Sequence, residues 1–213
     1  MQSVMLDVFE SPQIQEKISS LSRRLDQSAV LRELAILVMV LQVLGKPADV
    51  DFLMSVLGTD TPNQSVFRKD ETLREIISVN SGRIQARSAV LAEYLLRGVF
   101  TGGNVLDVLK KLIRYAHDHG DHRNGYGEGI SNVYYETIRF GNVQAMFSEK
   151  GRLHFVREYY EYAKTLHRMQ NDPHFGYSMP WPASHFASTR QLSSTLRRHT
   201  PSRENGLAST HHT

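Results

Sequence analysis

Residues 34–44 read LAILVMVLQVL, the strongest apolar run of the chain, and this run decides the expected fold. The run is too short to cross a bilayer, because a spanning helix needs about 20 apolar residues. A helix that is apolar on every side belongs in the centre of a core. Gly45-Lys46-Pro47 follows directly and is typical of a helix end. The sequence therefore predicts a central helix from about Ala29 to Leu44, with other elements packed around it.

Helical periodicity continues on both sides of this run. Ser11-Pro12 has the residue types of a helix start, a cap followed by proline in the first turn, and Gly58 is typical of a helix end. Apolar residues recur at three- and four-residue spacing along most of the chain up to Met169, as in amphipathic helices. The predicted helices span 12–25, 29–44, 48–57, 67–77, 89–100, 104–117, 130–147 and 152–169.

One segment alternates instead of following helical spacing. Residues 77–80 and 83–87 place apolar and polar side chains in turn, and Ser81-Gly82 stands between them. This pattern predicts a small β-hairpin. Three helices, a hairpin and a further helix are the order of a winged-helix module. The expected fold class is therefore mainly α: a winged-helix-like module, then helical hairpins, then a disordered C-terminal tail.

The predicted organisation has four parts. Residues 1–28 form an N-terminal helix and linker, and 29–100 form the winged-helix-like module. Residues 101–175 form a helical bundle or the start of a helical-repeat region, and 176–213 form the tail. No repeat of fixed period is visible, so both interpretations of the third part stay open.

The chain changes character after Phe175. Asn171-Asp172-Pro173 has the pattern of a capped helix start, but 176–182 reads GYSMPWP and the remainder is rich in Ser, Thr, Arg and His. Reading the codons from one base earlier can give Trp-Leu-Gln-Tyr-Ala-Met-Ala, a continuation that is compatible with a helix. At both alanine positions the shifted codon can encode only alanine. We therefore expect a truncated or frameshifted fragment. A genuine disordered tail, too poor in apolar residues to fold, is the alternative.

Composition excludes some function classes. The chain has 213 residues, no Cys and a formal net charge of +3. Disulfides, thiolate catalysis and cysteine-based zinc sites are excluded, which fits the cytosol. The mild positive charge permits nucleic-acid binding without arguing for it. Residues 1–10 lack the basic and apolar regions of a signal peptide, so we expect a cytoplasmic protein with no membrane partner.

His117, Asp118, His119, Asp121 and His122 form the densest group of potential metal ligands. A zinc site needs three or four ligands that converge at about 2.0–2.2 Å. Closeness along a glycine-rich segment does not by itself bring these side chains together around one metal ion. A solvated connection between two helices is the favoured interpretation, and we expect no metal and no cofactor in this chain.

A second set of candidates is basic and falls on the winged-helix-like module. Its members are Arg68, Lys69, Arg74, Arg83 and Arg87. In DNA-binding versions of the module a helix enters the major groove and basic side chains contact phosphates. Here Asp70, Glu71 and Glu75 share the helix and would repel phosphates. An ordinary solvated face is favoured, and the five are nucleic-acid ligands only in an alternative reading.

No catalytic residues can be assigned from the sequence. A phosphate loop of the form G-x-x-x-x-G-K-[ST] is absent, because Gly45-Lys46-Pro47 has the wrong upstream spacing and a proline where the hydroxyl belongs. No Ser/His/Asp set can be assembled, and His154 and His167 are single histidines on predicted helices. The sequence therefore predicts a chain that is not an enzyme.

Three stretches carry a resemblance to a known family. They are 31–37 (LRELAIL), 45–50 (GKPADV) and 87–96 (RSAVLAEYLL). The region of about 29–175 that contains them resembles the part after the ATPase core in bacterial signal-transduction NTPases with numerous domains (STAND-type). In that family a winged-helix module follows the nucleotide-binding domain, and helical repeats, here expected to be tetratricopeptide-like, follow the module. The family's phosphate-loop and acidic magnesium residues have no counterpart here.

The resemblance implies a non-catalytic regulatory and interaction segment of an ATP-dependent protein of signalling or defence. ATP and Mg²⁺ would bind in an upstream domain, and the partners would be other proteins or the adjoining ATPase domain. The alternative is a free-standing winged-helix DNA-binding regulator with a helical dimerisation region. An upstream phosphate loop would favour the first reading, and salt-sensitive duplex binding by 29–100 would favour the second.

Overall fold

The computed structural model describes residues 11–59, 69–120 and 128–166, without the side chains of 128–131. All of them belong to one unit of the chain, Met1–Ser178. Several predictions concern residues outside these ranges. The tail 176–213 with its alternative reading frame, the basic candidate Arg68, and the candidate metal ligands Asp121 and His122 lie outside the described residues.

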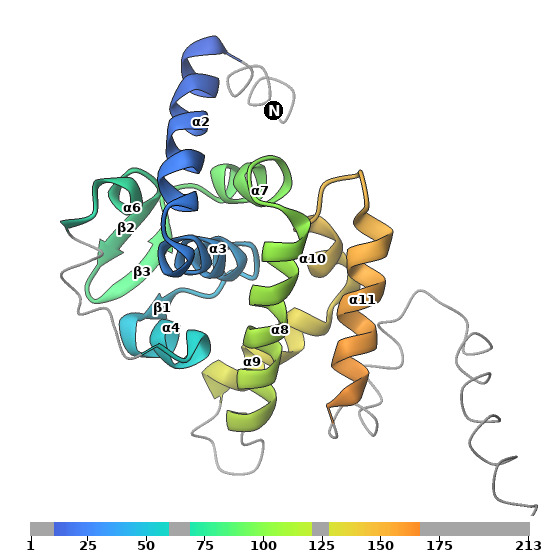
Figure 1. Ribbon diagram of the computed structural model, residues 1–213. Helices are drawn as coiled ribbons and strands as arrows, with labels where there is room; N and C mark the ends of the chain where they lie inside the picture. The colour runs from blue at the N-terminus through green and yellow to red at the C-terminus, as the bar shows by residue number, and fades with distance from the viewer. Residues whose placement is uncertain (1–10, 60–68, 121–127, 167–213) are drawn as a thin grey trace, which may run out of the picture. The chain divides into compact units, whose positions relative to one another are not determined.

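The described residues are mainly helical, with one small antiparallel sheet of three strands, as predicted (Figure 1). The helices are α2 (Pro12–Asp26), α3 (Ala29–Val43), α4 (Val50–Leu57), α6 (Glu71–Ile76), α7 (Ala89–Gly98), α8 (Gly102–His119), α9 (Glu128–Ile138), α10 (Phe140–Ala145) and α11 (Arg152–Thr165). The strands are β1 (Ala48–Asp49), β2 (Ile77–Asn80) and β3 (Arg83–Ala86).

Helix α3 is the centre of the core. Its residues 34–41 are each at most 2% exposed, and α2, α4, α7, α8 and β3 all pack against it. Ser28 begins the helix, because its hydroxyl accepts a hydrogen bond from the Leu31 amide at 3.3 Å. Gly45 follows the helix with a φ of 68°, a conformation that other residues adopt only with strain. The predicted central helix is confirmed.

Strands β2 and β3 form the predicted hairpin. Val79 pairs with Ile84 across the two strands. The turn residues Ser81 and Gly82 have positive φ values of 51° and 79°, as in the tight turns that match the twist of a hairpin. Ile84 points into the core and is 2% exposed, so the hairpin is held by side-chain burial as well as by its ladder.

The start of the predicted helix 48–57 is wrong. Ala48 and Asp49 form strand β1, which pairs antiparallel with Ile84 and Arg83 of β3 and gives the strand order β1-β3-β2. Asp49 then caps α4, because its carboxylate accepts a hydrogen bond from the Phe52 amide at 2.8 Å. The elements therefore follow the order of a winged-helix module. A helix is followed by a strand, two helices and a hairpin, and the first strand pairs with the hairpin.

The helices after this module share its core. Helix α8 packs on α3 and α4, and its buried stripe includes Val105, Leu109 and Leu112, each fully buried. At the rim, Lys111 of α8 forms an ion pair with Glu33 of α3 at 2.7 Å. The described part of the winged-helix-like module and the helices that follow it therefore bury apolar surface against each other.

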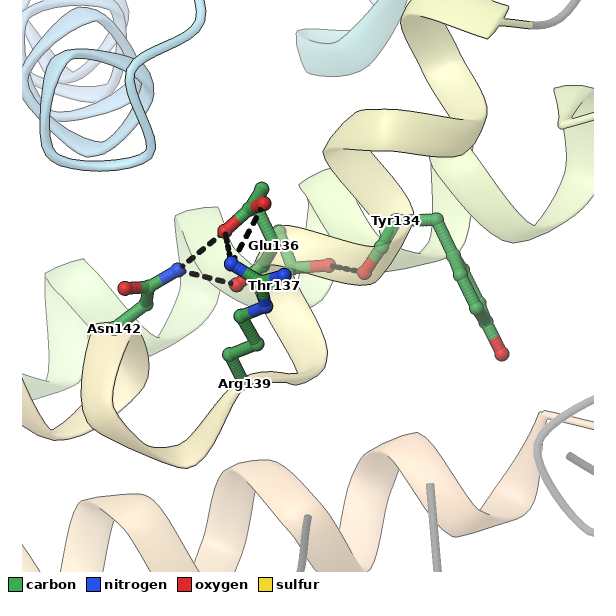
Figure 2. A network of polar contacts seen from close by, with 5 residues as sticks. All are labelled: Tyr134, Glu136, Thr137, Arg139 and Asn142. Carbon is green, nitrogen blue, oxygen red and sulfur yellow. Dashed lines mark hydrogen bonds and ion pairs between the residues drawn. The ribbon is translucent and has the colours of Figure 1, made fainter. Parts of the chain in front are cut away.

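The predicted helix 130–147 is interrupted at Arg139, between α9 and α10. The carboxylate of Glu136 accepts hydrogen bonds from Arg139 at 3.1 Å and from the Asn142 amide at 2.9 Å (Figure 2). The last carbonyls of α9 find partners on α11: the Tyr159 hydroxyl donates to the Thr137 carbonyl at 3.0 Å, and the Tyr160 hydroxyl donates to Ile138 at 2.7 Å. The break is stable because these buried acceptors are satisfied.

We expect these two tyrosines to make the fold sensitive to alkali. Burial raises the pKa of both hydroxyls above their ordinary value, because the phenolate is poorly solvated inside the core. Their contribution to the free energy of unfolding is therefore complete below pH about 10 and is lost as the pH rises through their higher folded pKa values. Chemical denaturation at pH 8 to 12 should show stability that falls above pH 10.

The double variant Tyr159→Phe/Tyr160→Phe should be less stable than the parent at pH 8, by about 1–3 kcal/mol for each unsatisfied carbonyl. Its stability should also fall less steeply above pH 10. Tyr162→Phe is the matched control. This half-buried side chain lies on the same helix, and the donors to the two carbonyls are Tyr159 and Tyr160. An unchanged alkaline slope in the double variant would contradict this assignment.

Candidate functional site

Helix α6 occupies the position of the third helix of the winged-helix-like module. Asp70 begins it by accepting a hydrogen bond from the Leu73 amide at 2.9 Å. Leu73 and Ile76 are buried, whereas Glu71, Arg74 and Glu75 are exposed. The helix therefore presents a short outer face on which acidic and basic side chains are mixed.

Helix α2 lies beside this outer face (Figure 1). Its apolar residues Ile18, Leu21 and Leu25 are buried. On the adjoining side Arg24 donates from Nη2 to the Glu75 carboxylate at 2.8 Å, and this hydrogen bond raises the pKa of the guanidinium. An exposed pair of this kind contributes little to stability, but it fixes which side of α2 faces α6.

The two helices enclose an open groove of about 860 Å³. Its lining residues are Lys17, Ser20, Arg24, Glu71, Arg74, Glu75 and Arg87. Four of these side chains are cationic and two are anionic, so the groove carries a positive excess. Arg24 and Glu75 pair with each other. The positive excess therefore comes from Lys17, Arg74 and Arg87, which outnumber the one remaining carboxylate, Glu71.

Arg87 ties the end of the hairpin to α6. Its backbone amide donates to the Ile76 carbonyl at 2.9 Å, and its Nε donates to the Arg74 carbonyl at 2.9 Å. The second bond holds the guanidinium at the rim of the groove, with its terminal nitrogens unbonded within the part of the chain that the structure describes. Arg74 and Arg87, which the sequence placed on a helix and on a hairpin, thus lie together.

The other basic candidates do not join them. Arg83 pairs in register with Asp49 and lines a different, smaller cavity of about 290 Å³ beside Phe52 and Val133. Lys69 is exposed just before α6 and does not line the groove. The structure therefore brings together two of the four described basic candidates, and it adds Lys17 and Arg24 from α2.

Sequence reasoning missed these two residues. Lys17, Ser20 and Arg24 recur at helical spacing and form a polar stripe beside the apolar one. That signal places them on one side of a helix, but the helix could have faced solvent. Only the packing of α2 against α6 makes the stripe part of a groove.

The described candidate metal ligands have separate partners. The His117 ring lies 2.7 Å from the Asp118 carboxylate. The His119 ring stacks on Tyr115, with centroids 4.2 Å apart, and its Nδ1 lies 3.0 Å from the Tyr115 carbonyl. Within 11–59, 69–120 and 128–166, no group of three His, Cys, Asp or Glu side chains could hold a metal ion.

None of the helices in the described ranges has both the length and the apolar character that a transmembrane segment needs. The central helix α3 has 15 residues, and its residues 34–41 are buried in the core. The candidate functional site in the described residues is the groove between α2 and α6, which Lys17, Arg74, Arg87 and Glu71 line.

No known protein family, no curated protein and no solved structure matches this chain.

Proposed function

We propose that the chain is a non-catalytic regulatory and interaction segment whose partners are proteins. The observation that carries this proposal is the contact between α2 and α6, in which Arg24 bonds Glu75 at 2.8 Å. It turns the outer face of α6 into one wall of a groove lined by charges of both signs. An open groove lined by charged side chains suits the side chains of a partner segment, which can place complementary charges opposite them.

The same contact weighs against the DNA-binding reading. A helix is about 10–12 Å across with its side chains, and the major groove is about 12 Å wide, so a recognition helix needs clear space on both sides. Helix α2 contacts α6 where Arg24 meets Glu75 and takes up part of that space. Glu71 and Glu75 would also lie next to phosphates, at a cost in electrostatic free energy.

We propose further that the parent protein is a STAND-type signalling ATPase of bacterial type. The order of a winged-helix-like module and helical hairpins supports this, and α8 to α11 would then begin a tetratricopeptide-like sensor arm. ATP and Mg²⁺ would bind upstream of this segment. The nucleotide sequence of the locus tests the idea: we expect an upstream frame that encodes a phosphate loop, and an upstream frame without one counts against it.

A duplex-binding experiment separates the two functions. The full chain and a 20-base-pair duplex of mixed sequence are titrated by fluorescence anisotropy at physiological salt. We expect affinity no tighter than non-specific binding, roughly 10⁻⁴ to 10⁻⁶ M. Nanomolar binding that falls steeply with salt and is lost in Arg74→Gln would instead support the DNA-binding regulator and overturn the proposal.

A further inference from the structure

The groove between α2 and α6 has the properties of an anion-binding surface. Lys17 and Arg74 face it from opposite walls and have no ion-pair partner within the described residues. Arg87 offers its terminal nitrogens at the rim, because only its Nε is engaged by the Arg74 carbonyl. Three cationic groups thus surround one concave space in which Glu71 is the single unpaired carboxylate among the described lining residues.

The spacing of the cations indicates an extended ligand. Lys17 and Arg24 are separated by two helical turns, about 10 Å along α2. Arg24 is engaged by Glu75 at one end of this row, and Lys17 lies at the other end, so the cations without an ion pair in the described residues are spread along the groove and one small anion would not contact them all. An extended peptide covers the same length in about three or four residues, and its alternate side chains point to the same side. Carboxylates at alternate positions would therefore reach successive cations.

We infer that the groove between α2 and α6 binds a short, extended acidic segment of a partner protein. Carboxylates of that segment accept hydrogen bonds from Arg74, Arg87 and Lys17, since guanidinium groups bind carboxylates in a bidentate manner. The Ser20 hydroxyl on the wall formed by α2 is a further donor. This inference rests on the proposed interaction function and names the chemistry of the partner.

The probes are fluorescein-labelled deca-glutamate, deca-glutamine and the 20-base-pair duplex, each titrated with the full chain at low salt. We expect deca-glutamate to bind, deca-glutamine not to bind, and duplex binding to be weaker and insensitive to Arg74. Arg74→Gln and Lys17→Gln, one on each wall, should each weaken deca-glutamate binding about fivefold. Glu71→Gln should strengthen it, because the single unpaired carboxylate of the groove is removed.

Arg157→Gln is the matched control. It removes one exposed positive charge on α11, outside the lining of the groove, and should leave affinity within about twofold. Circular dichroism confirms that each variant is folded. The inference is overturned if deca-glutamate does not bind, or if Arg157→Gln weakens binding as much as the groove variants do. In either case the interaction function survives as long as duplex binding stays non-specific. Tight duplex binding that depends on Arg74 overturns both.

Discussion

Leu37→Ala is expected to lower the free energy of unfolding by about 3–4 kcal/mol. Leu37 lies in the middle of α3 and is fully buried, as are its neighbours Ile36 and Met39. The substitution removes three carbon atoms from the centre of a core to which α2, α4, α7 and α8 all contribute. The surroundings cannot close the cavity without moving several helices, so the cost of the cavity adds to the lost burial of the side chain. Urea denaturation measures it.

Leu153→Ala is the control of identical chemistry. Leu153 lies in the first turn of α11 and is 69% exposed, so its removal should change stability by less than about 0.5 kcal/mol. If both variants lost the same free energy, α3 would not be the centre of the core. Because the helices after the module share this core, Leu37→Ala should also lower the protection of the backbone amides of α8 to α11 against hydrogen exchange.

Gly102→Ala is expected to destabilise the fold by about 1–3 kcal/mol. Gly102 is the first residue of α8, and a Cβ atom at this position would overlap the ring of Phe155 on α11. That ring cannot move freely, because it stacks on Phe147 with centroids 5.4 Å apart and an interplanar angle of 15°. Thermal unfolding followed by circular dichroism should show a lower midpoint.

Gly103→Ala provides the comparison one residue further along. A Cβ atom there meets no atom within 4 Å, and alanine favours helix by up to about 1 kcal/mol over glycine. The variant should therefore match or exceed the parent in stability. Equal losses in the two variants would mean that α8 and α11 do not approach each other at Gly102.

The parts of the fold that could be predicted are those with a strong local signal. The run 34–44 has no polar face and could only be central. Residues 77–87 alternate around Ser81-Gly82, and the positive φ of both turn residues agrees with that reading. Ser28 and Ser88 each cap the helix that follows, through bonds within three residues of the cap. All of these features depend on neighbours in sequence.

The features that could not be predicted depend on distant residues. Strand β1 has two residues, too few to show alternation, and exists because Ala48 and Asp49 pair with β3. The break between α9 and α10 requires hydroxyl groups from α11, 22 residues later in the chain. The local signal at the break was weak: Gly141 and Asn142 are poor helix formers inside an otherwise continuous pattern.

The candidate site was predictable only in part. The sequence indicated that Arg74 and Arg87 belong to the third helix and the hairpin, and the structure places them at one groove. It also named Arg83, which the structure places at another cavity next to β1. The wall formed by α2 could not be predicted, because the periodicity of a helix does not specify the element it packs against.

The central claim is that α2 lies along α6 and so forms the groove. The chain has no cysteine, so spin labels can be attached to Ser20→Cys on α2 and Glu71→Cys on α6 without other changes. Both positions line the groove and neither belongs to the Arg24–Glu75 pair. Double electron–electron resonance should give one narrow distribution at short distance. A broad distribution that extends to long distances would show that α2 is not held against α6 and would contradict the account.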